Sequence, residues 1–170
     1  MLWGSIPCTG GTPWARYNLR RYPETFPKRL RRLRAEWRML TYNFFRVSNI
    51  IQQRKGPWVI EWPSRCSYWE SPIVKQFLIK QKVHVYQAKG TGCAFGLKAI
   101  SGPLRDYPMS KSWLIKGTLP NIEEYLHRDC PCERCATHAP TTGANTAHSG
   151  RSTARFVASI HRMLSDIIDK

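Results

Sequence analysis

Three cysteines and two histidines crowd into one short segment of the chain. Cys130, Cys132 and Cys135 stand between His127 and His138. Thiolate and imidazole are soft ligands that suit tetrahedral zinc, so we expect Cys130, Cys132, Cys135 and His138 to bind one zinc ion, with His127 as the alternative histidine. A cluster of reduced surface cysteines is the plain alternative. We disfavour a redox Cys-x-x-Cys pair because no helix start obviously follows Cys132.

A second pair of reactive side chains follows two short apolar runs. Cys8 comes after the run 2–6, and Glu61 comes after the run 58–60. Both runs are typical of buried strands, and ligands of α/β sheets bind at the carboxyl ends of strands. We therefore expect Cys8 and Glu61 at the ends of adjacent parallel strands, facing one cleft. The alternatives are a small residue near the chain end for Cys8, and a capping or surface residue for Glu61.

The segment 16–38 carries nine Lys or Arg residues against two acidic ones. The whole chain has 27 Lys and Arg against 11 Asp and Glu, a net charge of +16. Such an excess favours a polyanionic partner, foremost nucleic acid, although a ribosomal or membrane-surface role would give the same balance. The interleaved Tyr17, Tyr22 and Phe26 suit stacking on bases, or else cover the core. We expect phosphate contacts from Arg16, Arg20, Arg21, Arg29, Arg31, Arg32, Arg34 and Lys111. The plain alternative is a solvated helix surface.

Hydrophobic periodicity places these residues on an alternating series of elements. An apolar face with helical spacing predicts a helix over 28–54, formed by Leu30, Leu33, Trp37, Leu40, Phe44, Val47 and Ile51. Other patterns predict strands at 2–6, 58–60, 83–87 and 113–115, and helices at 72–81 and 156–167. Loops are expected over 9–27 and 139–153. This alternation predicts an α/β fold, a mostly parallel sheet with helices on its faces and a small Cys/His-rich insertion at 127–138.

Two of these segments resemble motifs of the DNA cytosine-5 methyltransferases. Ser5-Ile6-Pro7-Cys8-Thr9 resembles the strand and Pro-Cys loop whose cysteine attacks the cytosine ring. Val59-Ile60-Glu61-Trp62-Pro63 resembles the later strand that ends in Glu-Asn-Pro or a close variant. The stretches 92–97 and 111–113 resemble a later region of divergent, phage-like and mobile-element-encoded members. The resemblance implies that Cys8 and Glu61 are catalytic, with Glu61 holding the ring nitrogen and exocyclic amine of a flipped base.

The resemblance also implies a fold and a reaction. It implies a partial Rossmann-like methyltransferase sheet, DNA as substrate and S-adenosylmethionine as methyl donor. A thiolate can add to cytosine when a carboxyl group hydrogen-bonds the ring nitrogen, and the base must leave the duplex to be reached.

This chain departs from the family in three ways. Trp62 stands where the family has asparagine, the Gln-x-Arg-x-Arg pattern is missing, and no Gly-rich turn with a following acid is present to bind S-adenosylmethionine. In the family that turn precedes the Pro-Cys loop. We therefore expect the C-terminal half of a methyltransferase-like domain that binds nucleic acid but is inactive unless an N-terminal half is supplied. The alternative is a non-catalytic nucleic-acid-binding or ribonucleoprotein component with a structural zinc.

Length and composition set the remaining expectations. A chain of 170 residues with 42% hydrophobic residues predicts a single domain, 1–170, with a buried core. No uncharged apolar stretch approaches the ~20 residues of a membrane span, and no basic segment followed by an apolar one suggests a signal peptide. The clustered cysteines fit a metal site better than a disulfide framework. We expect an intracellular protein without a membrane partner.

Overall fold

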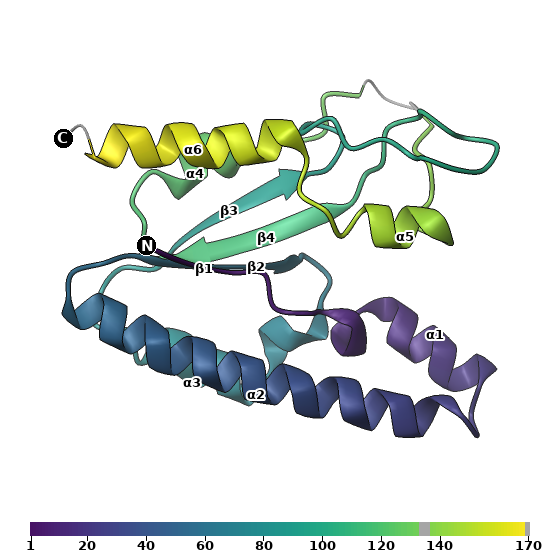
Figure 1. The fold of residues 1–170 in the computed structure, drawn as a ribbon, viewed down its shortest axis with the longest axis horizontal. Coiled ribbons are helices and arrows are strands. Elements are labelled where there is room, and N and C mark those ends of the chain that lie inside the picture. Colours follow the sequence, from purple (N-terminus) through teal and green to yellow (C-terminus); the bar gives the residue numbers. More distant parts are fainter. Residues whose placement is uncertain (133–136, 169–170) are drawn as a thin grey trace. The chain divides into compact units, whose positions relative to one another are not determined.

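The computed structural model describes residues 1–132 and 137–168, which form two compact units. Unit 1 comprises Met1–Tyr86 and Lys116–Leu119, and unit 2 comprises Gln87–Ile115 and Pro120–Lys170. The first elements of the chain are β1 (Leu2–Gly4), the 3-10 helix η1 (Thr9–Gly11), α1 (Pro13–Arg21), α2 (Phe26–Gln53), β2 (Trp58–Pro63), the 3-10 helix η2 (Ser67–Glu70) and α3 (Pro72–Ile79). They are followed by β3 (Tyr86–Thr91), β4 (Ser112–Gly117), α4 (Ile122–Leu126), α5 (Ala144–His148) and α6 (Ala154–Ile168) (Figure 1).

The four strands form one sheet in the order β1-β2-β4-β3. β1 and β2 are parallel, with Leu2 opposite Trp58 and Gly4 opposite Ile60, whereas the other pairings are antiparallel. The α/β class is confirmed, but the expectation of a mostly parallel sheet is wrong, and the sheet is not clearly Rossmann-like. Turns fill the described stretch 92–111 between β3 and β4. Because a parallel return needs a long crossover, usually a helix, this connection reverses the chain instead (Figure 1).

The long helix of unit 1 agrees closely with its predicted bounds. α2 begins at Phe26, and Pro27 fits its first turn because a helix leaves the first backbone N–H groups without partners. Its buried Phe44 meets Trp58 of β2 edge to face, with ring centroids 6.3 Å apart. Val47, expected in the core, is 42% exposed. Phe45 is buried instead and stacks on Phe77 of α3 at 3.7 Å, because the inner face of α2 also has to cover α3.

The predicted loop over 9–27 contains a helix that the sequence analysis missed. α1 starts at Pro13 and packs Ala15 and Leu19 against Phe26 and Leu30 of α2. Pro13 indicated a loop, but a proline is equally suited to the first turn of a helix. One side of α1 therefore packs on α2, and the other side of this basic helix is open to solvent.

Unit 2 is built around aromatic and aliphatic side chains of β4 and α6. Phe156 of α6 packs on Trp113 of β4 and on Phe95, with centroids 5.5 and 5.1 Å apart. α4 packs against α6, and the Tyr125 hydroxyl donates a hydrogen bond to the Asp166 carboxylate. The helix predicted over 156–167 is therefore confirmed, whereas the five-residue helices α4 and α5 are too short for periodicity to indicate. None of the helices in the described part of the chain has the length and apolar composition of a membrane span.

Candidate metal centre and nucleic-acid surface

Four metal-ligating side chains of unit 2 converge on one point. The ligand atoms of Cys93, Cys130, Cys132 and His138 all lie within 4.8 Å of one another. Cys93 Sγ is 3.3 Å from Cys130 Sγ, and Cys130 Sγ is 3.4 Å from His138 Nε2. Cys93 is buried, whereas Cys130 is exposed and the other two are half-buried. This group could hold a metal such as zinc, because three sulfurs and one imidazole nitrogen make a four-ligand set.

A short parallel bridge brings the distant Cys93 to this group. Gly90, in β3, pairs with Arg128. The Arg128 N–H donates to the Lys89 carbonyl at 3.1 Å, and the Thr91 N–H donates to the Arg128 carbonyl at 3.0 Å. Since both chains run in the same direction from this bridge, Cys93 and Cys130 lie side by side although 37 residues separate them.

Hydrogen bonding and burial make the three thiols unequal. Burial raises the pKa of Cys93 to about 11, and the Cys93 thiol donates to Cys130 Sγ. That hydrogen bond lowers the pKa of Cys130, because it stabilises the thiolate. The hydrogen bond with Cys130 raises the pKa of Cys132. The group therefore favours a thiolate at Cys130, the form in which cysteine binds metal.

The structure brings together three of the four predicted ligands. Cys130, Cys132 and His138 belong to the group, and Cys135 lies outside the described residues. The alternative ligand His127 lies elsewhere, with its ring nitrogens 3.9 Å from a Glu123 oxygen and 3.7 Å from an Asp129 oxygen. The fourth member, Cys93, was missed. The bridge between β3 and residue 128 brings it near, and no local spacing signals such a bridge.

The parallel pairing of β1 and β2 places the segments of Cys8 and Glu61 side by side. The pairing of the two strands ends with Gly4 opposite Ile60, and the hydroxyl of the next residue, Ser5, donates a hydrogen bond to Glu61 Oε2 at 3.1 Å. The Trp62 indole N–H donates to the Ile6 carbonyl at 2.8 Å. The predicted adjacency of the two parallel strands is confirmed, but their predicted ends are wrong: β1 already ends at Gly4, four residues before Cys8, and Glu61 lies inside β2, which continues to Pro63. A shared site for the thiol and the carboxylate stays a prediction.

After Cys8 the chain packs tightly against η2. A Cβ added to Gly11 would come within 2.8 Å of Tyr68 Cγ and 2.9 Å of Cys66 Sγ, so no side chain fits there. The Ser67 hydroxyl also donates to the Gly11 carbonyl at 3.0 Å. Burial raises the pKa of Cys66 to about 12, and the nearby Cys8 contributes to the rise. Cys66, which the sequence analysis did not single out, is therefore protonated at neutral pH.

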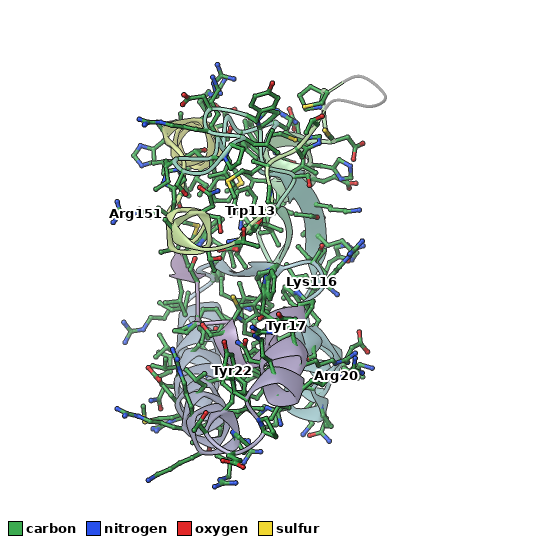
Figure 2. All side chains as sticks on the ribbon, turned by 90° about the vertical axis from the view of Figure 1, so that its right-hand side faces the viewer. Tyr17, Arg20, Tyr22, Trp113, Lys116 and Arg151 are labelled. Atoms are coloured by element: carbon green, nitrogen blue, oxygen red, sulfur yellow. The ribbon has the colours of Figure 1, made fainter. Side chains whose placement is uncertain are left out.

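The solvent face of α1 alternates aromatic rings with arginines. Trp14 and Tyr17 are 44% and 50% exposed, and their rings meet edge to face with centroids 5.5 Å apart. Arg20 is exposed beside them, and Arg21 lies over the ring of Tyr22 at 5.9 Å (Figure 2). Positions three and four apart lie on one side of a helix, so these side chains form one continuous surface.

The first half of α2 adds a dense row of cations. Arg29, Arg31, Arg32 and Arg34 are all exposed. Within residues 1–132 and 137–168 none of them forms an ion pair with a carboxylate. Like charges three or four residues apart repel each other by about 0.2–0.5 kcal/mol per pair, and cations oppose the dipole at a helix N-terminus. In the absence of a partner, this row of arginines therefore lowers the stability of α2, so the helix does not need it for folding.

Lys111, the remaining predicted phosphate contact, lies in unit 2. Its ammonium group donates to the Ser149 carbonyl at 2.5 Å and lies over the Trp113 ring at 5.5 Å. The side chain is half-buried. Lys111 thus holds the segment around Ser149 against β4, and its contact with phosphate stays a prediction.

Comparisons with known proteins find no matching protein-family model, no matching curated protein and no matching solved structure.

Proposed function

We propose that the protein binds nucleic acid through α1 and the first half of α2. The observation that carries this proposal is the solvent face of α1, where Trp14 and Tyr17 are exposed beside arginines. Aromatic rings stack on bases and arginines pair with phosphates, so a surface that offers both suits a strand with accessible bases. Exposing two large rings costs the free protein hydrophobic burial, which binding would recover.

The row on α2 extends this surface with charge alone. Nucleic acid holds condensed counterions, which arginines release when they contact phosphates. Partner charges would also relieve the repulsion within the row. In this proposal α1 supplies the rings that stack on bases, and both helices supply the arginines that neutralise phosphates.

Titrating a fluorescently labelled single-stranded nucleic acid with the protein tests this function. Binding is followed by fluorescence anisotropy at several salt concentrations. We expect the logarithm of affinity to fall linearly with the logarithm of salt concentration. Replacing Arg29, Arg31, Arg32 and Arg34 by glutamine should reduce the magnitude of the slope by up to about 3, since each contact to a single strand contributes about 0.7. Arg46→Gln, on the distant half of α2, is the matched control and should leave the slope unchanged. No binding at low salt, or a slope untouched by the four substitutions, would contradict the proposal.

A second candidate function is covalent chemistry on cytosine in DNA, as the resemblance implies. It is favoured by the parallel pairing that sets Ser5, three residues before Cys8, beside Glu61. The whole chain can be incubated with S-adenosylmethionine and a duplex that contains 5-fluorocytosine. We expect binding without a covalent adduct. An adduct that Cys8→Ser does not form would establish the second function instead.

We further infer that zinc is the metal of the Cys/His group. Soft thiolates select zinc, copper(I) or iron–sulfur clusters, and imidazole suits zinc well. A set of three sulfurs and one nitrogen is common in structural zinc sites, whereas iron–sulfur clusters are mostly held by four thiolates. Metal analysis of protein purified without chelator tests this assignment.

A further inference from the structure

We propose that Cys93, Cys130, Cys132 and His138 form one closed zinc site, in which the ion ties the end of β3 to the segment after α4. This inference rests on the zinc assignment above and is independent of nucleic-acid binding. It replaces Cys135 of the predicted set by Cys93, which stands 37 residues before Cys130.

The spacing of the four ligand atoms matches a tetrahedral ion. Zn–S bonds of about 2.3 Å place two sulfurs of a tetrahedron about 3.8 Å apart. Cys93 Sγ and Cys130 Sγ are 3.3 Å apart, and Cys130 Sγ and His138 Nε2 are 3.4 Å apart. All separations within the group stay within 4.8 Å. The two sulfurs would move apart by about 0.5 Å, and the widest separation would shrink by up to about 1 Å, to admit the ion.

Backbone hydrogen bonds hold each part of the site independently of the metal. The Thr91 N–H and hydroxyl both donate to the Arg128 carbonyl, at 3.0 and 3.1 Å, which fixes the segments before Cys93 and Cys130. The Ala139 N–H donates to the Pro108 carbonyl at 2.9 Å, beside the third ligand segment. Side chains that are held in place in this way lose less conformational entropy when they bind a metal ion, and this strengthens metal binding.

The site is closed because the protein supplies four ligands. Catalytic zinc keeps a position for water or substrate, whereas structural zinc is bound by four side chains. The ion would join the end of β3 to the segment after α4, beside the bridge between Gly90 and Arg128. The role of the ion is therefore structural, because it adds a cross-link between these two segments.

Cysteine-to-serine variants of the full chain separate Cys93 from Cys135. The wild-type chain, expressed with added zinc and purified without chelator, should hold one zinc per chain. Cys135→Ser is the matched control and should retain it, whereas Cys93→Ser should lose at least nine-tenths of it, on the order of a tenfold drop in occupancy. No zinc in the wild type would overturn the metal assignment and the site together. Zinc kept by Cys93→Ser, or lost by Cys135→Ser, would overturn this ligand set and leave zinc as the metal.

A measurement on the wild-type chain decides the matter even if Cys93→Ser fails to fold. The chain is alkylated with iodoacetamide before and after treatment with a chelator, and labelled cysteines are identified by mass spectrometry. Cys93, Cys130 and Cys132 should become labelled only after the metal is removed, whereas the labelling of Cys135 should be the same in both samples. Cobalt(II) substitution should give the strong visible absorption of a tetrahedral thiolate site. Protection of Cys135 by metal, or labelling of Cys93 unaffected by the chelator, would overturn the proposal.

Discussion

Neutralising the arginine row of α2 should make the protein more stable, not less. The perturbation is the fourfold variant with glutamine at Arg29, Arg31, Arg32 and Arg34. Glutamine keeps the helix propensity and much of the aliphatic stem of arginine, so charge is the main property removed. The result distinguishes a row kept for binding from a row kept for folding.

The magnitude follows from helical spacing. The row and its neighbours contain five like-charge pairs three or four residues apart, which are Lys28–Arg31, Lys28–Arg32, Arg29–Arg32, Arg31–Arg34 and Arg34–Arg38. At about 0.2–0.5 kcal/mol each, their repulsion sums to about 1–2.5 kcal/mol. The variant also loses one favourable pairing, Arg32 with Glu36, of about 0.2–0.5 kcal/mol. We therefore expect a net gain of about 1–2 kcal/mol in the free energy of unfolding at low ionic strength.

Urea unfolding followed by circular dichroism, in low and in high salt, measures this gain. At 1 M salt the screening length falls to about 3 Å, shorter than the spacing of neighbouring side chains, so the gain should largely vanish. Arg46→Gln is the matched control, because residue 46 has no charged residue three or four positions away on α2. A fourfold variant that is less stable than the wild type at low salt would refute the reasoning and assign the row a structural role.

Four further substitutions test the packing and the titration of unit 1. Gly117→Ala should destabilise the protein by about 1–3 kcal/mol or more in urea unfolding, because the new Cβ would lie 2.4 Å from the Trp58 carbonyl oxygen; unchanged stability would refute this close approach. Phe77→Ala should cost about 3–5 kcal/mol by the same assay, whereas the 81% exposed Ile79→Ala should cost little, and equal effects would contradict the described core. The raised pKa of Cys66, about 12, means that its stabilising effect is complete below about pH 9 and is lost as pH rises towards 12, by up to about 1.4 kcal/mol per pH unit. Unfolding measured from pH 8 to 10 should therefore show a shallower fall for Cys66→Ala than for the wild type, and parallel curves would show that Cys66 titrates normally.

The long elements of the fold were readable from the sequence, and the direction of the strands was not. The apolar face from Leu30 to Phe44 covers several turns, so periodicity predicted α2 almost to its ends. Helical spacing predicted Val47 in the core, but Phe45 is buried instead. This difference depends on contact with α3, which the spacing within α2 cannot show. Strand direction depends on connections, and the stretch 92–111 carries no pattern that separates a turn-rich reversal from a crossover.

The parts of the candidate sites that are close together in the sequence could be predicted, whereas the parts that only the fold brings together could not. Cys130, Cys132 and His138 are close in the sequence, so their types and spacing sufficed to predict a metal site. Cys93 is brought to them by the bridge between Gly90 and Arg128, which no local spacing signals. The aromatic and basic character of the α1 surface was readable from composition. Its arrangement was not, because the proline at its start resembles a loop signal.

The central claim is that α1 and the first half of α2 bind nucleic acid. Its most direct test is the affinity for single-stranded nucleic acid after the aromatic rings on α1 are removed. Stacking contributes about 1–3 kcal/mol per base, so Trp14→Ala combined with Tyr17→Ala should weaken binding by at least about fivefold. The slope of affinity against salt should stay unchanged, since no charge is lost. Tyr42→Ala, which removes a 62% exposed ring from the later part of α2, is the control and should bind like the wild type. Equal affinity of the double variant and the wild type would contradict the proposed nucleic-acid surface.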